Sequence, residues 1–304
     1  MQTQEKKISI LIAGGTGILG SFVTKHALTK PNLQVNILVR DPNKNKELVQ
    51  QVESSGGRVI KGDLGDVNSL KDVTKDIHTV IPCIWSFDEK IYIDGQTALL
   101  NDALKNGVKR FFTSNFIFPT DKISKDEHSY WKNKKTFDEI LSKAPISIVD
   151  IQPGFYLEYY FLYYQAEGFH YWGDIDQKID LTTIEDIGRF TAAIAANENA
   201  VGTFVCPGNS LSTKEIAEIY NQVRGTNIKP YKKGSIEELK KLAHEAKSDP
   251  DMKSVIVTHT LVRYDGRAKL PDRFDIPDVK PTSLAEALQQ NPALVLKEVT
   301  VSEK

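Results

Sequence analysis

The sequence predicts an α/β fold in which helices cover both faces of a doubly wound parallel sheet. Short apolar runs alternate with helical patterns through the first half of the chain, and Gly, Pro or Asp follows most of the runs. Consecutive strands that are separated by helices pair in parallel, since a crossover helix joins parallel neighbours. The length of 304 residues allows this domain and a smaller C-terminal region.

The elements follow from this alternation in chain order. The first strand is the apolar run 8–13, and a glycine-rich turn separates it from a helix at 21–30. Later strands are expected at 34–39, 58–61, 79–85, 108–116 and 146–151, and later helices at 44–55, 66–75, 88–106 and 124–142. Asp66 is a candidate N-cap, since its side-chain oxygen can accept from free N–H groups of a helix start. These successive βα units support the parallel sheet.

The alternation loosens after Gly154. Helices are expected at 183–196, 212–224, 235–247 and 283–290, with a strand at 202–206. Ser212 or Thr213 is available as an N-cap, and Gly225 ends that helix. We therefore divide the chain into a sheet domain at 1–152, completed by about 183–208, and a smaller region formed by 153–182 and 209–304.

Composition excludes several classes of function. The net charge is −1 with no basic block, which argues against binding to nucleic acid or to a membrane surface. No apolar run approaches the roughly 20 residues of a membrane span, and the polar N-terminus has no signal-peptide pattern. Cys83 and Cys206 fit no disulfide or metal spacing and are expected to be reduced core thiols of a cytoplasmic protein. The six histidines share no spacing, so no metal site is expected.

The glycine-rich turn has the spacing GxxGxxG between a strand and a helix, which is typical of dinucleotide binding. Gly14 allows the sharp turn, Gly17 leaves room for a pyrophosphate, and Gly20 lets the helix pack against the strand. The free N–H groups and the positive dipole end of the helix then face the phosphates. We expect cofactor contacts along this turn, from Gly14, Thr16, Gly17, Ile18, Leu19 and Gly20.

Arg40 ends the second strand, where an acidic residue would bind a ribose diol and select NAD. An arginine instead offers a planar set of donors to a 2′-phosphate, which predicts a preference for NADP (NADPH). Lys44 or Lys46 could assist. The alternative is an exposed arginine that pairs with Asp41.

Asp63 follows the third strand, where the adenine edge of a dinucleotide is expected, and Leu64 comes directly after it. We assign both residues to the cofactor site. The alternative for Asp63 is a turn-forming aspartate.

Tyr130 and Lys134 form a YxxxK pattern on a predicted helix, and the spacing of four puts them on one face. A phenol ionises near pH 10, and a neighbouring ammonium favours proton transfer from it at neutral pH. The pattern follows the fifth strand, whose end at Thr113 and Ser114 could supply the hydroxyl that orients a substrate carbonyl. The alternative is a solvated charge run at 132–135.

Several segments resemble the NmrA-like and isoflavone-reductase-like group of atypical short-chain dehydrogenases, over about residues 7–225. The resemblance lies in Gly14 to Gly20, Leu38-Val39-Arg40-Asp41, Gly62-Asp63-Leu64, Val108-Lys109-Arg110-Phe111, Thr113-Ser114-Asn115-Phe116, Gln152-Pro153-Gly154-Phe155 and Thr182 to Asp186. It implies an NAD(P)-binding Rossmann fold. It also implies that Thr113, Pro153 and Phe155 border the cofactor, and Ser114 and Phe116 the substrate.

The reductases of this group carry a lysine in the form K-x-x-apolar, which Lys134 matches here. Two separate patterns, YxxxK and K-x-x-apolar, thus select Lys134 over Lys132 and Lys135. The Pro-Ser-Glu-Phe-Gly segment of the reductases becomes 113–117 here, with Asn115 and Ile117 in place of the acid and the glycine. Some members of the group, like NmrA, bind the dinucleotide and regulate a partner protein without catalysis.

An aromatic segment follows Pro153-Gly154, with seven aromatic residues between 155 and 164. We expect packing roles for most of them and substrate contacts from at least one of Phe155, Tyr156 or Tyr159, because tyrosine suits a flat aromatic ligand. The sequence therefore predicts an NADPH-dependent reductase of a carbonyl or activated double bond in an aromatic or hydrophobic small molecule. The alternative is a non-catalytic NADP(H) sensor. Either protein could form a homodimer.

Overall fold

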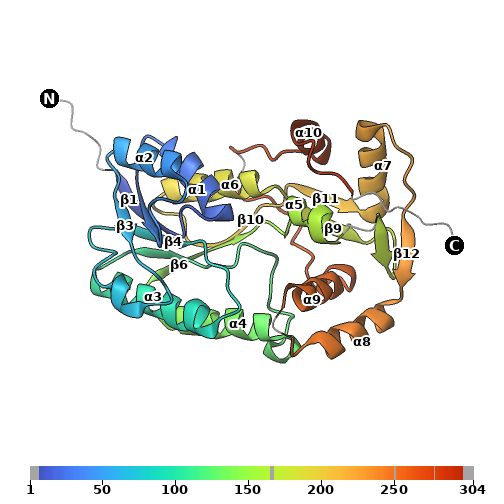
Figure 1. Cartoon of the computed structure of the whole chain (residues 1–304), viewed down its shortest axis with the longest axis horizontal. Coiled ribbons are helices and arrows are strands. Elements are labelled where there is room, and N and C mark those ends of the chain that lie inside the picture. The colour runs from blue at the N-terminus through green and yellow to red at the C-terminus, as the bar shows by residue number, and fades with distance from the viewer. Residues whose placement is uncertain (1–6, 165–167, 250, 277, 297–304) are drawn as a thin grey trace.

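We analysed a computed structural model of the chain (Figure 1). It describes residues 7–164, 168–249, 251–276 and 278–296. The described elements form a central sheet with helices on both faces, and a second group of helices and short strands beside the carboxyl edge of that sheet.

The central sheet has seven parallel strands in the order β10-β6-β5-β4-β1-β2-β3. The strands are β1 (Ile8–Ala13), β2 (Leu33–Val39), β3 (Val59–Lys61), β4 (Thr79–Pro82), β5 (Arg110–Phe112), β6 (Ser147–Gln152) and β10 (Gly202–Val205). The chain builds outward from β1 to β3 and then returns to add β4 on the other side of β1. This change of direction opens a crevice at the carboxyl ends of β1 and β4, where ligands bind in folds of this kind.

The helices cover the two faces of the sheet in separate groups (Figure 1). One face packs against α1 (Ile18–Leu28), α2 (Lys46–Ser54) and α6 (Ile184–Ala196), and the other against α3 (Gln96–Lys105) and α4 (Ser129–Ser142). Successive side chains of a strand point to opposite faces. Ile10 and Ile12 of β1 therefore join the first core, and Leu11 and Ala13 join the second.

Arg110 ties the sheet to the end of α6. Its side chain is 1% exposed, and its guanidinium donates to the carbonyl oxygens of Ala195 at 2.8 Å and Ala200 at 3.1 Å. The last carbonyls of a helix lack intrahelical donors and carry partial negative charge. A buried arginine at this position therefore satisfies both its own donors and the helix end.

Two expected helices differ in the structure. The helix expected at 66–75 is only a 3₁₀ turn, η1 (Val67–Leu70), although Asp66 does cap it by accepting from the Asn68 N–H. The turn ends because Lys71 is extended, with ψ 128°, and Asp72 then has a positive φ of 58°. The helix expected at 88–106 is a π-helix, η2 (Lys90–Gly95), followed by α3.

A break at His128 divides the helix expected at 124–142. The 3₁₀ turn η3 (Lys125–Glu127) ends there, His128 is extended with φ −169°, and its Nδ1 accepts the backbone N–H of Tyr130. That imidazole acts as the N-cap of α4. The strand expected at 108–116 is also shorter, since β5 ends at Phe112.

The expected helices of the C-terminal part are confirmed as α6, α7 (Thr213–Arg224), α8 (Ile236–Ala246) and α10 (Leu284–Gln290). Ser212 caps α7 by accepting from the Glu215 N–H, and Gly225 ends it in the left-handed region. We did not foresee α9 (Met252–Tyr264), the sheet of β7 (Phe155–Tyr156), β9 (Lys178–Thr182) and β11 (Asn209–Ser212), or the pair of β8 (His170–Trp172) and β12 (Tyr231–Gly234).

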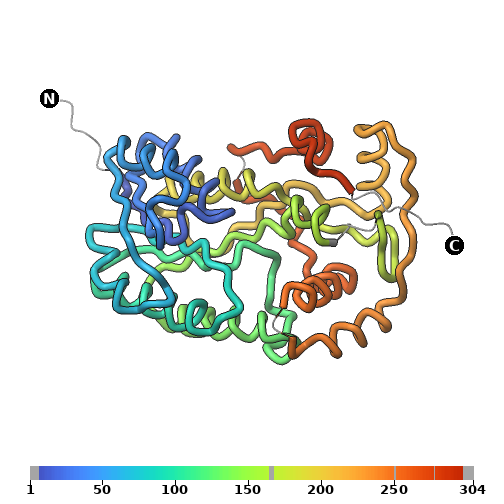
Figure 2. Tube along the Cα trace, in the orientation of Figure 1, coloured from blue at the N-terminus to red at the C-terminus, as the bar shows by residue number. Residues whose placement is uncertain are grey.

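Helix α9 returns to the start of α4, as the trace in Figure 2 shows for the orange segment beside the green one. Val255 and Leu261 share a core with Trp131. The Trp131 Nε1 donates to Thr258 Oγ1 at 3.1 Å. This core therefore joins the sheet domain to the C-terminal region. The domain boundary that we place at residue 152 stays a prediction.

We expect Arg110→Ala to lower the free energy of unfolding by about 3 kcal/mol or more, because it leaves buried carbonyl oxygens without donors. Urea unfolding followed by circular dichroism measures the change. Lys109→Ala is the control, since Lys109 is exposed, and it should cost less than about 0.5 kcal/mol. Equal stability of the two variants would show that the α6 carbonyls do not depend on the guanidinium.

Candidate active site

A cavity of about 860 Å³ lies at the carboxyl edge of the central sheet. Its walls come from the segments that directly follow β1, β2, β3, β4, β5 and β6, and from α4 and α9. Most of the residues that the sequence singled out line it, namely Gly14, Thr16, Gly17, Ile18, Leu19, Arg40, Asp63, Leu64, Ser114, Phe116, Tyr130, Lys134, Phe155, Tyr156 and Tyr159. The topology thus brings together residues that are far apart in the chain.

The turn after β1 needs glycine at three positions for reasons inside the protein. Gly14 has φ +79°. A Cβ on Gly15 would lie 2.6 Å from Ile37, and a Cβ on Gly20 would lie 2.1 Å from the Gly14 oxygen. Gly17 is different, because its φ is −74° and a Cβ there would meet only the Gly14 oxygen at 3.1 Å. The empty space beside Gly17 therefore opens into the cavity, where a phosphate group fits.

Helix α1 begins in this turn with Gly17 as its N-cap. Its first turn contains no acidic residue, so the positive end of the helix dipole is not neutralised by its own side chains. The free N–H groups of a helix start bind anions when they face a ligand site. The geometry of the turn therefore fits a pyrophosphate.

Arg40 and Lys44 are exposed and line the cavity at the end of β2, whereas Lys46 is not part of the lining. Within the described residues, Arg40 forms no ion pair with Asp41, whose carboxylate accepts the Asn43 N–H instead. The guanidinium is thus available to a ligand anion.

Asp63 lines the cavity beyond β3 and also shapes the turn. Its Oδ1 accepts the Gly65 N–H at 2.9 Å. One oxygen of the Asp63 carboxylate therefore forms the turn. Because Asp63 and Leu64 both line the cavity, they remain candidates for contact with the adenosine part of a dinucleotide.

Lys134 is buried in the cavity wall at 2% exposure. Its Nζ donates to Tyr92 Oη at 3.1 Å and lies 3.4 Å from both the Ser114 carbonyl oxygen and Asn115 Oδ1. Burial lowers the pKa of this ammonium to about 8, against the attraction of Asp138 and Asp150.

The neighbouring lysines have other surroundings. Lys132 is exposed and pairs with Glu89 at 3.0 Å, and Lys135 is half-buried on another side of α4. The structure therefore separates Lys134 from the charge run that contains it.

Tyr130 is 4% exposed and lines the cavity. The Lys134 Nζ lies 5.3 Å from the centre of its ring and the same distance from the ring of Tyr92. The ammonium thus rests between two aromatic rings, which is favourable for a desolvated cation. Sequence reasoning missed Tyr92, because its position on η2 carries no motif.

The end of the cavity beside the segment after β6 is mostly aromatic. Tyr156 stacks on Tyr159 at 5.3 Å, and Tyr159 meets Tyr163 edge to face at 5.4 Å. Tyr160 and Phe161 are buried away from the cavity, which confirms packing roles for part of this segment. The side chain of Tyr164 lies outside the described residues.

Three candidates, Ser114, Thr113 and Pro153, have structural partners. The Ser114 hydroxyl accepts the Ile84 N–H and donates to the Ile84 carbonyl, although Ser114 lines the cavity. Gly20, Thr113 and Pro153 are outside the lining within the described residues. Thr113 Oγ1 donates to Asp150, and the Pro153 carbonyl accepts from Thr182. These contacts hold the strand ends in place.

Helix α9 supplies a wall that the sequence did not indicate, through Met252, Val255, Ile256 and His259. The His259 ring stacks on Trp131 at 5.0 Å and meets Tyr130 at 5.2 Å. Burial, with the nearby Arg263 and Lys134, lowers the pKa of His259 to about 3, so the imidazole is neutral. The sequence signal that could have indicated this wall is the helical spacing of residues 255, 256 and 259, which puts them on one face.

The two cysteines differ. Cys206 is buried in the core as expected, but Cys83 is only partly buried and lines the cavity, which corrects the core assignment for that thiol. Both are free. Among the described residues, no group of three His, Cys, Asp or Glu side chains could hold a metal ion. Within the same part of the chain, no helix is long and apolar enough to cross a membrane.

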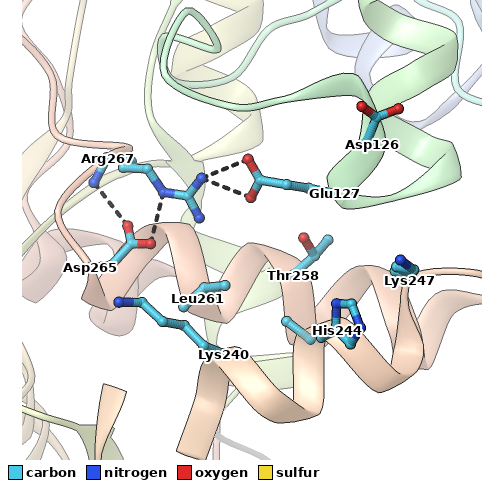
Figure 3. Close-up of a pocket in the computed structure, with 10 residues that line it drawn as sticks. Asp126, Glu127, Lys240, His244, Lys247, Thr258, Leu261, Asp265 and Arg267 are labelled. Carbon is cyan, nitrogen blue, oxygen red and sulfur yellow. Dashed lines mark hydrogen bonds and ion pairs between the residues drawn. The ribbon is translucent and has the colours of Figure 1, made fainter. Parts of the chain in front are cut away.

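A second pocket, of about 590 Å³, lies on the other side of α9 (Figure 3). Arg267 forms two ion pairs in this pocket. It donates to both carboxylate oxygens of Glu127, at 2.8 and 2.7 Å, and to Asp265 at 2.7 Å. None of the site residues expected from the sequence is part of its described lining. The ion pairs fix the end of α9 to η3, directly before the helix that carries Lys134.

Comparison with known proteins supports the same architecture. Eugenol synthase 1 from Petunia hybrida is 34% identical over 125 residues, but the alignment covers only 39% of this chain and 39% of that protein. An isoflavone reductase homolog from Solanum tuberosum is 26% identical over 93% of this chain and 98% of that protein. Leucoanthocyanidin reductase from Vitis vinifera, solved as a complex with NADPH, matches with a TM-score of 0.76 at 18% identity over 93% of this chain and 98% of that one.

The structural match confirms the α/β fold that the sequence predicts. The model of the NmrA-like family matches residues 6–266, which is most of the chain. The chain therefore belongs to the NmrA-like family.

Proposed function

We propose that the chain is an NADPH-dependent reductase of a carbonyl or activated double bond in an aromatic or hydrophobic small molecule. The observation that carries the proposal is the buried Lys134 ammonium in the wall of a cavity whose other end is a phosphate-type glycine turn. The chain is an oxidoreductase of the isoflavone-reductase type, in line with its reductase relatives.

The cofactor end uses the turn at 14–20, Arg40 and Asp63. The α1 N-terminus and the space beside Gly17 hold the pyrophosphate, and Arg40 with Lys44 binds the 2′-phosphate. NADPH, when bound, supplies a hydride to the carbon that is reduced. The protein must then supply one proton to the oxygen of a carbonyl, or to the second carbon of a double bond.

Lys134 and Tyr130 are the proton-handling groups of the cavity. With a pKa of about 8, the Lys134 amine is mostly protonated at neutral pH and can release that proton more readily than an ordinary lysine. Tyr130 lies beside it, with its ring centre 5.3 Å from the Lys134 Nζ. We assign proton donation to Tyr130 and charge stabilisation to Lys134.

The walls favour an uncharged, flat substrate. Trp85, Tyr163 and Met252 line the cavity and are between 40% and 51% exposed. Exposed apolar groups around a cavity mark a site for an apolar ligand. The charged side chains Arg40, Asp41, Lys44 and Asp63 lie at the other end, among the strand ends assigned to the cofactor.

A screen of NADPH oxidation against aromatic ketones, enals and quinones tests this function. Turnover that disappears in Lys134→Ala supports it. Tight NADPH binding without turnover of any compound would favour the non-catalytic sensor, and partner binding that differs between NADP and NADPH would then be the measurement that decides.

We expect the protein to bind NADPH at least about tenfold more tightly than NADH, which corresponds to about 1.4 kcal/mol. The reason is the Arg40 guanidinium, which lines the cavity at the end of β2 and forms no ion pair among the described residues. Titration calorimetry with both cofactors measures the ratio. Arg40→Ala should remove it, whereas Arg58→Ala should not, because Arg58 donates to the Lys75 carbonyl outside the cavity. Equal affinities in the parent protein would contradict the assignment.

Gly17→Val should abolish dinucleotide binding and leave the fold intact. The valine side chain would fill the space beside the turn, while the φ of −74° at this position suits any residue. Cofactor titration and circular dichroism of the same variant separate the two effects. Near-normal affinity would place the phosphates elsewhere.

Lys134→Ala should lower turnover far more than Lys132→Ala or Lys135→Ala, because only Lys134 is buried at the site. Tyr130→Phe should lower turnover by about 10² to 10⁴, the usual contribution of general acid catalysis. Steady-state rates at saturating NADPH measure both. Unchanged turnover in Tyr130→Phe would leave Lys134 or water as the proton donor.

A further inference from the structure

Two polar side chains continue from Lys134, with Asn115 in the cavity wall and Asp138 outside the described lining. Asn115 Oδ1 lies 3.4 Å from the Lys134 Nζ. The Asn115 Nδ2 donates to both oxygens of Asp138, at 3.1 Å each.

The carboxylate determines which way the Asn115 amide faces. An ionised carboxylate only accepts hydrogen bonds, an ammonium only donates, and an amide has one end for each. With Asp138 in place, the NH₂ group satisfies the carboxylate and the oxygen faces Lys134. The reversed amide would place N–H donors against the ammonium and an oxygen against the carboxylate, so both contacts would be repulsive.

We propose that Asp138 is a positioning residue for Lys134, which acts by holding the Asn115 amide with its oxygen toward the ammonium. The inference rests on the proposed reductase function for its catalytic meaning. Asn115 completes the coordination of Nζ together with Tyr92 Oη and the Ser114 carbonyl oxygen. The three acceptors fix where the Lys134 protons point.

The described titratable groups around Lys134 come from α4, β6, η2 and α9. Asp138 on α4 and Asp150 on β6 attract the ammonium, and burial opposes its charge. Tyr92 on η2, Tyr130 on α4 and the neutral His259 on α9 complete the surroundings. Asp150 differs from Asp138, because Thr113 and Gln152 occupy its oxygens and it does not contact Asn115 through any described hydrogen bond.

The ionisation of Lys134 can be measured without any substrate. We suggest NMR titration of protein labelled with ¹³C at the lysine Cε, with the Lys134 signal assigned from its loss in Lys134→Arg. In the parent protein we expect a midpoint near 8. In Asp138→Asn, which preserves the side-chain shape, we expect the midpoint to fall by about one pH unit, since a nearby opposite charge shifts a pKa by about 1–3 units.

Glu139→Gln is the matched control, because Glu139 is the next acid on α4 but is exposed and pairs with Lys125. It should leave the midpoint unchanged. Asn115→Ala should lower the midpoint in its own right, which keeps the test valid if Asp138→Asn unfolds. A midpoint that stays at its parent value in both Asp138→Asn and Asn115→Ala would overturn the proposal.

A double variant shows whether Asp138 acts on Lys134 through the Asn115 amide or only through its negative charge. If Asp138 acts through the amide, Asp138→Asn should lower the midpoint much less in the Asn115→Ala background than in the parent. Fully additive shifts would overturn the proposed relay. NADPH affinity should be unchanged in Asp138→Asn, and the pH profile of turnover should move with the NMR midpoint. Failure to find a substrate would count against the reductase function but would leave the NMR result as it stands.

Discussion

The burial of the Lys134 ammonium is the constraint on which the site depends. A desolvated cation needs nearby acceptors, and here they come from three elements: Tyr92 from η2, the Ser114 carbonyl and Asn115 from the end of β5, and the ring of Tyr130 from α4. The irregular elements have a role in this arrangement. The break at His128 fixes where α4 begins and therefore which face presents the lysine.

The two ends of the cavity differ in their electrostatic surroundings. At the glycine turn, backbone N–H groups and a helix dipole provide fixed positive potential without any buried charge. At the other end, aromatic rings exclude water around one lysine, and a low dielectric strengthens its interactions. A dinucleotide with anionic phosphates and a flat reactive ring suits both ends at once, and the change of direction between β1 and β4 places them in one crevice.

The features that could be predicted from the sequence are those that local patterns determine. The seven strands, the glycine turn and the face shared by Tyr130 and Lys134 depend on periodicity and spacing, so they could be read from the chain. The boundaries of η1 and the split at His128 depend on tertiary contacts, such as the Asp102 carboxylate that accepts the Asp72 and Thr74 N–H groups. Tyr92 and Asp138 carry no motif, because their roles exist only through partners that the fold brings to them.

Helix α9 shows why one wall of the cavity was missed. Its buried face contains Ser254, Thr258 and Thr260 among the apolar residues, which obscures an amphipathic pattern. Two of these hydroxyls attach α9 to α4 and its N-cap: His128 Nε2 lies 2.9 Å from Ser254 Oγ, and Trp131 donates to Thr258. The Arg267 ion pairs with Glu127 and Asp265 add a third attachment (Figure 3). The cavity wall formed by α9 and the helix that carries Lys134 are therefore held as one unit, so that a change of residue on α9 can alter the shape of the cavity while the lysine keeps its position.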